Sequence, residues 1–142
     1  RIKSFFNPDN EGTLIADGID TFPKAPSYIV KDKQILISIC DKNLSFIVED
    51  HMSKIFSLLS LYSVSVNMMQ NSAVSFSICI DDDKYKTDKL IKDLQKYFSV
   101  TYNKGLSLYT IRYYREKDLK ELLANKKIIL EQKSRNTIQV IA

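Results

Sequence analysis

The residues of this chain whose types and spacing suit ligand binding lie in two short polar segments. One is the loop 41–50, and the other is the QNSA sequence at 70–73, which follows SVN at 65–67. Backbone amides at the start of a helix can bind a carboxylate, and side chains such as those of Asn67 and Ser72 can bind an amino group. These segments favour a binding site for a free amino acid, although Ser and Asn in turns more often bond only to nearby backbone groups.

Other kinds of chemistry have little support. Residues 81–83 are three adjacent aspartates, but no further ligand follows at the spacing of a metal-binding loop, and negative charge just before a helix suits the helix dipole. His51 is the only histidine, and no nucleophile or acid accompanies it at a known motif spacing. Cys40 and Cys79 are isolated in apolar strand patterns, which is typical of buried reduced thiols. We therefore expect no catalytic residue and no metal site.

The composition is that of a globular chain with one ordinary domain or two small ones. Of its 142 residues, 44% are hydrophobic and 27% are charged, and no apolar run approaches the ~20 residues of a membrane span. The net charge is only +4, and the lysines mostly alternate with acids, which is typical of a solvated surface rather than a nucleic-acid interface. Three glycines are too few for a phosphate-binding loop. We expect a cytoplasmic protein without nucleic-acid or membrane partners, and Arg1 as the first residue favours a fragment.

The elements that must position the polar segments can be predicted from hydrophobic periodicity. A nearly apolar strand at 35–40 precedes a helix at 48–62, whose start could be capped by Ser45 or Asp50. Alternation over 63–81, broken at Gln70, predicts a β-hairpin. A second helix starts near Thr87, and a short strand follows at 99–102. Strand–helix–strand–strand–helix–strand is the order of a ferredoxin-like sandwich.

A second unit with the same order begins after a predicted turn at 103–105. Its strands and helix fall at 106–113, 116–124, 128–132 and 137–141. The chain stops where the last helix of this unit would begin, and one helix cannot cover a sheet face alone. A further strand candidate at 27–31 could complete its sheet. The fold class is therefore α+β, with two ferredoxin-like (βαββαβ) units, the second lacking its last helix.

Five stretches of the chain resemble, in order, the C-terminal regulatory region of aspartate kinases, which consists of tandem ACT domains. They are FFNPDNEGTLI at 5–15, ILISIC at 35–40, SKIFSLL at 53–59, SVSVNMMQNSAVSFSI at 63–78 and GLSLYTIR at 105–112. The resemblance covers nearly the whole chain. It implies an allosteric regulatory domain that binds a feedback amino acid, threonine or lysine, at an interface between two ACT domains.

The resemblance also implies a division of the chain. Residues 1–26 would connect to a kinase domain of the same chain, residues 34–103 would form the first ACT domain, and residues 27–33 plus 104–142 would form the second. The family transfers the γ-phosphoryl group of ATP to the β-carboxylate of aspartate. ATP and Mg are implied only for the kinase domain, so we expect no cofactor in residues 1–142.

Carried over by position, the effector contacts of the family fall on three stretches. They are Ser45, Val48, Asp50, Met52, Ser65, Val66, Asn67, Asn71, Ser72 and Ala73. Lysine-inhibited members often have an aspartate in place of Asn67 and a glutamate in place of Ala73, and Asp50-His51 replaces a glycine–aromatic pair. A neutral Asn67 binds an ammonium less strongly than a carboxylate does, so threonine is predicted to bind at least as well as lysine.

The strand at 63–69 would be an edge strand in this order, and it has apolar residues on both faces, including Val64 and Met69. Unpaired sheet edges invite pairing with another chain, so we expect a homodimer through the first ACT domain. An alternative is a stand-alone ACT module, without a kinase domain, that regulates a partner protein. A ferredoxin-like nucleic-acid binder is disfavoured by the charge and by the missing aromatic strand motifs.

Overall fold

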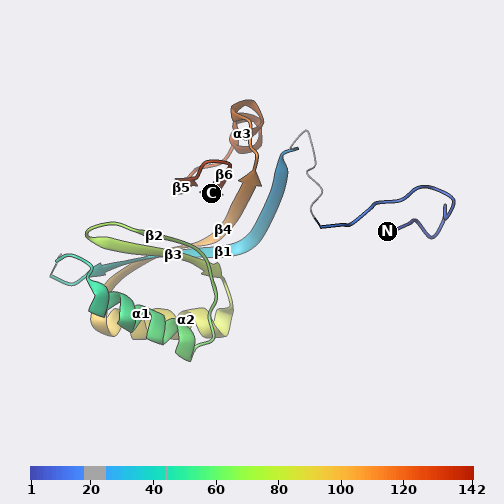
Figure 1. The fold of residues 1–142 in the computed structure, drawn as a ribbon. Coiled ribbons are helices and arrows are strands. Elements are labelled where there is room, and N and C mark those ends of the chain that lie inside the picture. Colours follow the sequence, from blue (N-terminus) through green and yellow to red (C-terminus); the bar gives the residue numbers. More distant parts are fainter. Residues whose placement is uncertain (18–24, 44) are drawn as a thin grey trace.

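The computed structural model describes residues 1–17, 25–43 and 45–142. Within these residues, six strands and three helices follow one another along the chain (Figure 1). They are β1 (Ser27–Asp41), α1 (Glu49–Leu61), β2 (Val66–Asn71), β3 (Ser75–Asp81), α2 (Lys84–Tyr97), β4 (Phe98–Arg112), α3 (Glu116–Leu123), β5 (Leu130–Lys133) and β6 (Thr137–Ile141).

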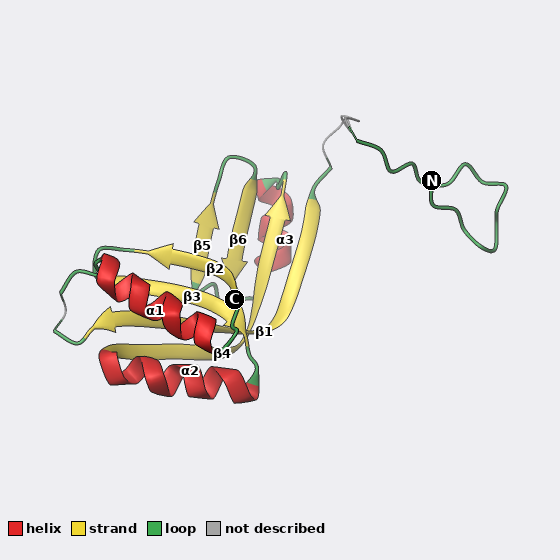
Figure 2. Ribbon diagram, turned by 60° about the horizontal axis from the view of Figure 1, so that its bottom comes forward, coloured by secondary structure: helices red, strands yellow, loops and turns green. Residues whose placement is uncertain are grey.

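The six strands form one antiparallel sheet in the order β2-β3-β1-β4-β6-β5. The sheet is curled, and α1 and α2 lie side by side on the same face of its β2-β3-β1-β4 half, whereas α3 lies with the half formed by β6 and β5 (Figures 1 and 2). Strands β2 and β5 are the two edges of the sheet. The predicted hairpin at 63–81 is confirmed as β2 and β3, although Val74 lies before β3 and is half exposed.

Helices α1 and α2 form because each presents apolar residues at helical spacing to the sheet. The core beneath them includes Ile35, Ile37 and Ile39 of β1, Ile55 and Leu59 of α1, Phe76, Ile78 and Ile80 of β3, and Leu90, Ile91 and Leu94 of α2. Helix α2 starts at Lys84 rather than near Thr87, because the Asp83 carboxylate accepts the backbone N–H groups of Tyr85 and Lys86 at 3.0 and 3.1 Å.

The start of α1 differs from the expectation. Neither Ser45 nor Asp50 caps it; Val48 occupies the N-cap position, and its backbone N–H donates to Nδ1 of His51 at 3.4 Å. The His51 ring in turn packs edge-on against Phe98, with 5.7 Å between ring centroids. The single histidine therefore has a structural role at the helix start.

Strands β1 and β4 are each one long strand where two were predicted. The predicted turn at 103–105 is wrong, because β4 passes through it while pairing with β1 on both sides. Backbone irregularities are absorbed locally: the pairing register shifts between Lys31 and Leu36, and both Lys33 and Gly105 have positive φ angles, 56° and 71°. Glycine adopts such angles at no steric cost. The residues that suggested a turn are kept within the strand because β1 pairs with Asn103 before the irregularity and with Leu106 after it.

The second half of the sheet also has its own core. Leu119 and Leu123 of α3 pack with β4 and β6, and the other face of the sheet buries a cluster of Leu36, Met68, Cys79, Leu106, Leu108 and Ile141. Strand β5 begins at Leu130, two residues later than predicted. No helix in the described ranges is long and apolar enough to cross a bilayer.

Residues 1–17 lie away from the sheet (Figures 1 and 2). Ile2 and Thr13 exchange backbone hydrogen bonds of 2.9 and 2.8 Å and form an isolated β-bridge. Phe5 and Phe6 are almost fully exposed. Residues 18–24 of the predicted connector lie outside the described residues.

Candidate functional site

The two polar segments meet at one end of the sheet. The backbone N–H of Ile47, in the loop between β1 and α1, donates to the carbonyl oxygen of Ala73, in the turn between β2 and β3, at 2.9 Å. This contact arises because β1 ends, α1 begins and the β2–β3 turn reverses at the same end of the sheet. The loop 41–50 and the turn 70–73 therefore lie together.

Several polar groups at this end already have local partners. The Asp41 carboxylate accepts the backbone N–H groups of Asn43 and Ser45 at 3.0 and 3.3 Å. The Ser72 hydroxyl bonds to Ser75 at 2.8 and 3.1 Å and so closes the hairpin turn. Ser72 thus matches the ordinary role of serine in a turn. The hydrogen bonds that hold Asp41 in its charged form lower its pKa against the effect of desolvation.

The remaining predicted site residues at this end are less constrained. Asp50 lies exposed in the first turn of α1, and Asn71 and Ala73 are exposed in and beside the hairpin turn. Val48 is 44% exposed, and Met52 is half-buried against the core under α1. This end therefore presents a loop, a helix start and a turn to solvent.

The predicted residues Ser65, Val66 and Asn67 lie at the opposite end of β2. A strand rises by ~3.3 Å per residue, so Asn67 and Asn71 are separated by about 13 Å along it. Val66 packs partly into the core under α1. Within one copy of the chain, the ten predicted residues therefore form two groups at the two ends of one edge strand.

Asn67 belongs to a polar cluster of four side chains, Lys31, Gln34, Asn67 and Asp81, which we name the Asp81 cluster. Asp81 Oδ1 accepts from Gln34 Nε2 at 2.7 Å, from Asn67 Nδ2 at 2.9 Å and from Lys31 Nζ at 3.0 Å. Lys31 Nζ also donates to Asn67 Oδ1 at 2.8 Å, and Asn67 Nδ2 donates to Gln34 Oε1 at 2.8 Å. Hydrogen bonds, first from Gln34 and then from Lys31, hold the pKa of Asp81 below its ordinary value.

On its buried side, the Asp81 cluster contacts the thiol of Cys79. Cys79 is fully buried and its Sγ donates to Gln34 Oε1 at 3.4 Å. Desolvation, with the nearby charge of Asp81, raises the Cys79 pKa to about 11. A thiol with such a pKa stays protonated and unreactive at neutral pH, as expected from its position in an apolar strand.

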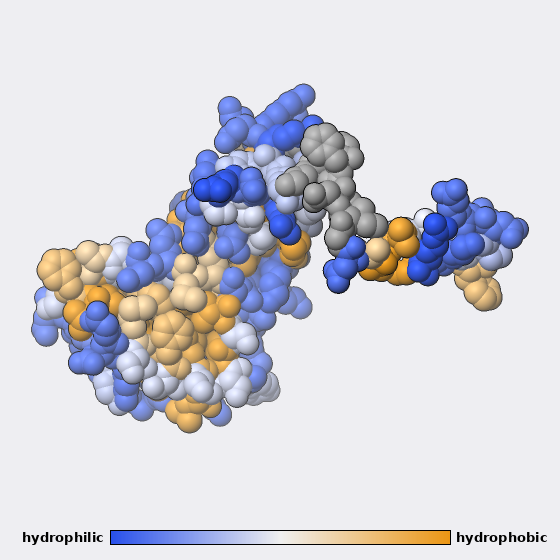
Figure 3. Space-filling model, in the orientation of Figure 1, coloured by the Kyte–Doolittle hydropathy of each residue, from blue (hydrophilic) through white to orange (hydrophobic). Residues whose placement is uncertain are grey.

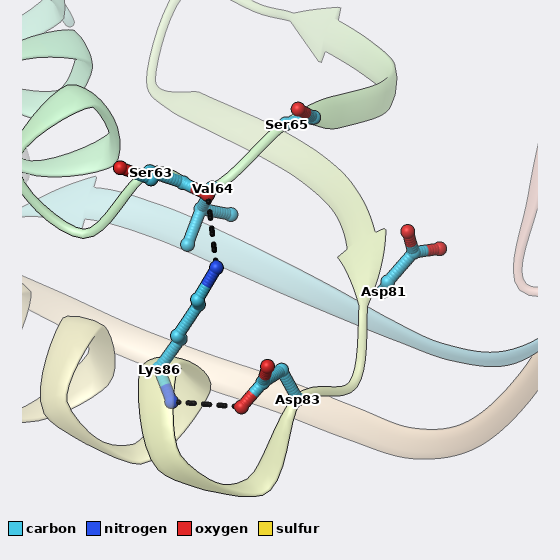
Figure 4. Close-up of a pocket in the computed structure, with 6 residues that line it drawn as sticks. All are labelled: Ser63, Val64, Ser65, Asp81, Asp83 and Lys86. Atoms are coloured by element: carbon cyan, nitrogen blue, oxygen red, sulfur yellow. Dashed lines mark hydrogen bonds between the residues drawn. The ribbon is translucent and has the colours of Figure 1, made fainter.

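A small open pocket of about 160 Å³ lies beside the Asp81 cluster (Figure 4). Its lining residues are Ser63, Val64, Ser65, Asp81, Asp83 and Lys86. Figure 4 shows Lys86 reaching from α2 toward the segment before β2, where its Nζ donates to the Ser63 carbonyl oxygen at 3.5 Å. Ser65 therefore lines a pocket that ends at Asp81, and this pocket lies at the opposite end of β2 from the hairpin turn.

Exposed apolar side chains surround the edge formed by α1 and β2. They include Phe46 at 68%, Leu61 at 68%, Val74 at 50%, Met69 at 48% and Val48 at 44%. Figure 3 shows apolar surface gathered over the side of the molecule that α1 occupies. Large exposed apolar patches on a protein surface mark interaction sites.

Sequence reasoning missed Lys31, Gln34 and Asp81 as partners of Asn67. Residues 31 and 34 are three apart, so a regular strand would place them on opposite faces, and only the irregularity in β1 brings them together. Asp81 was interpreted only as one of three aspartates before a helix. Gln34 follows the charged residues 31–33 and directly precedes the apolar run 35–40, so its place in the sequence resembles that of an exposed residue and gave no sign of a buried polar network.

No protein-family model matches the chain. Among solved structures, it is similar to a C-terminal regulatory domain of aspartate kinase from Porphyromonas gingivalis W83, at 21% identity and a TM-score of 0.67, covering 83% of this chain and 86% of that one. Clostridium acetobutylicum aspartate kinase matches at 20% identity and a TM-score of 0.71, covering 88% of this chain and 32% of that one.

E. coli aspartokinase III in complex with lysine and aspartate matches at 16% identity and a TM-score of 0.64, covering 84% of this chain and 30% of that one. The chain thus spans about a third of these longer kinase chains and most of the separate regulatory domain. At such identities the likeness is one of fold. The chain has the fold of the ACT-type regulatory region of aspartate kinases.

Proposed function

We propose that this chain is the allosteric regulatory region of an aspartate kinase and binds threonine or lysine between two copies of its first ACT domain. The observation that carries this proposal is the position of the predicted site residues at the two ends of edge strand β2. If two β2 strands pair antiparallel across a two-fold axis, Asn67 of one copy faces the region of Asn71 and Ala73 of the other. Only a dimer then completes the site.

The surface around β2 supports such pairing. An edge strand has unpaired backbone N–H and C=O groups along one side. Met69 on β2 and Val74 in the following turn are half exposed, and Phe46 and Val48 lie exposed in the loop that contacts this turn. A dimer formed here would bury these side chains and the open edge together.

The division of the chain is part of the proposal. Residues 34–103 would be the first ferredoxin-like ACT domain, supported by the strand order β2-β3-β1-β4 with α1 and α2 on one face. Residues 27–33 plus 104–142 would be the second, supported by the pairing of Ser27–Lys31 with Leu108–Arg112. The kinase domain would precede residue 1, and ATP, Mg and phosphoryl transfer to aspartate would belong to it.

The proposed effector has both an ammonium and a carboxylate. Backbone amides near the start of α1 would bind the carboxylate, because the positive end of a helix dipole favours negative charge. The backbone carbonyl of Val66, with polar side chains such as Asn71 of the partner copy, would accept from the ammonium. The complex of E. coli aspartokinase III with lysine and aspartate supports an amino acid as effector.

The proposal is tested by measuring association and binding on the same protein. We expect sedimentation to show a dimer at micromolar concentration, and calorimetry to show saturable binding of L-threonine or L-lysine. Met69→Lys should weaken both, because it places a charge on the pairing edge. Gln132→Lys, on the opposite edge strand β5, is the matched control and should change neither. A 16.4 kDa monomer that binds neither amino acid would contradict the proposal.

A further inference from the structure

Lys31 fills a cation position with its own side chain. Its Nζ lies 2.8 Å from Asn67 Oδ1 and 3.0 and 3.2 Å from the two carboxylate oxygens of Asp81. We propose that Lys31 is a specificity-determining residue: its ammonium occupies the cation position at Asn67 and Asp81 and so excludes cationic amino acids from it. The biological meaning of this inference rests on the proposed function, whereas the occupied cation position does not.

Two β-bulges create this position. In β1 the pairing register shifts between Lys31 and Gln34, and in β2 it shifts between Val66 and Met68, on either side of Asn67. Lys31 and Gln34 would point to opposite faces of a regular strand, yet both donate to Oδ1 of Asp81. Bulges re-aim side chains in this way and are common next to functional sites.

The ammonium of Lys31 is fully used. It has three N–H donors, and three oxygen atoms, one from Asn67 and two from Asp81, lie within hydrogen-bond distance. Two of these contacts are charge-assisted. A second ammonium, from a free amino acid, could contact all three of these oxygen atoms at once only by displacing that of Lys31.

The position does not depend on Lys31 for its shape. Gln34 is fully buried, and its Nε2 donates to Asp81 while its Oε1 accepts from Asn67 Nδ2. This fixes the orientation of the Asn67 amide, with Nδ2 toward Gln34 and Oδ1 toward the cation position. Removing the ammonium of Lys31 therefore leaves a preorganised set of acceptors rather than a collapsed site.

A tethered competitor is effective because its local concentration is high. A group linked by a short flexible chain competes at an effective concentration on the order of mM or more, so a free cationic amino acid at lower concentration gains nothing from these acceptors. The side chain of threonine is uncharged, so at this position it does not compete with the Lys31 ammonium as the side chain of lysine would. Lys31 would thus bias the site against lysine without touching the rest of the effector.

The test replaces Lys31 with methionine and uses two probes, n-butylammonium for the cation alone and L-lysine for the whole amino acid. We expect Lys31→Met to bind both at least roughly tenfold more tightly than the unchanged chain does, because the tethered ammonium is gone. Binding of n-butylammonium is followed by the NMR shift of the Asn67 side-chain amide. Lys92→Met, an exposed lysine of α2, is the matched control and should show no gain.

Further arms keep the outcomes separate. Lys31→Met combined with Asp81→Asn should lose the increase in affinity, because the charged acceptor is removed. L-norleucine lacks the side-chain ammonium, so its affinity should not increase in Lys31→Met. If n-butylammonium binds Lys31→Met and the unchanged chain equally, the inference is overturned whatever the amino acids do. If Lys31→Met binds n-butylammonium more tightly but no amino acid binds, the inferred cation position is supported and the proposed effector function is contradicted. Lys31→Ser serves as a second variant, judged by the same criterion.

Discussion

Gln34 shows how a single buried polar residue can be fully satisfied. Its side chain is completely buried, and its amide donates to the Asp32 carbonyl at 3.1 Å and to Asp81 at 2.7 Å. Its oxygen accepts from Asn67 at 2.8 Å and from the Cys79 thiol at 3.4 Å. A buried amide is tolerated only when its hydrogen bonds are made, so Gln34 organises the polar cluster and depends on it.

We therefore expect Gln34→Met to lower the free energy of unfolding by about 1–3 kcal/mol, because the methionine fills a similar volume but removes one hydrogen-bond partner each from Asn67 and Asp81. Urea unfolding monitored by circular dichroism measures this. Gln132→Met, at an exposed position of β5, is the control and should change stability little. An equal effect of the two substitutions would show that the network contributes nothing.

The ionisation of Asp81 makes the stability of the fold depend on pH, and the direction of this dependence follows from the shift in its pKa. Hydrogen bonds from Gln34, then Lys31 and Asn67, lower its pKa from 3.8 in the folded state. The carboxylate thus stabilises the fold fully above 3.8 and loses this contribution as pH falls through the lower folded-state pKa. Asp81→Asn should therefore be less stable than the unchanged chain at about pH 7, and the difference should shrink towards about pH 3. Urea midpoints at both pH values test this, and a difference that does not change with pH would refute it.

At the same scale, the sequence identified Asn67 as a polar residue of interest but not its partners. An aspartate at 67, which would favour lysine by charge alone, would in this fold lie beside Asp81, since Asn67 Nδ2 is 2.9 Å from its carboxylate. Like charges at that distance repel. The chemical type of residue 67 could be interpreted from sequence. Its neighbours could not, because the two β-bulges determine which side chains surround it.

At the scale of elements, helix starts depend on a few side-chain contacts. Asp83→Ala removes the carboxylate that accepts the Tyr85 and Lys86 N–H groups at the start of α2, so we expect a lower melting temperature. Asp83→Ser should retain most of the stability, because a serine hydroxyl can cap in the same geometry. Thermal unfolding of the three proteins tests this. Equal losses for alanine and serine would mean that the cap is not the cause.

The elements were predictable where periodicity was strong and failed where strand pairing overrode local signals. Alternation of apolar and polar residues predicted the hairpin at 63–81, and an apolar stripe predicted the helix at 48–62, which corresponds to α1. Residues 103–105 have turn-forming types, yet they lie inside β4 because β1 pairs along its length. That the loop after β1 lies at the same end of the sheet as the β2–β3 turn was predictable, because it follows from the order of the elements.

At the scale of the whole molecule, β1 and β4 run through both halves of the sheet. Each has 15 residues, and their pairing extends from Ser27 with Arg112 to Asp41 with Phe98. The sequence pattern divides the chain into two units, but neither half has a complete sheet without these shared strands. Long-range pairing of this kind cannot be inferred from local patterns; the sequence suggested only that 27–31 could join the second unit.

Shared strands predict one cooperative unfolding transition. Ile55 of α1 and Ile138 of β6 are both fully buried, each in a different core. Ile55→Ala and Ile138→Ala should each lower the free energy of unfolding by about 2–5 kcal/mol. Because β1 and β4 must unfold with either core, each substitution should speed global hydrogen exchange in both halves, as mass spectrometry of peptides from α2 and from β6 can show. Ile138→Ala that accelerates exchange only in β6 and its neighbours would mean that the two halves unfold independently.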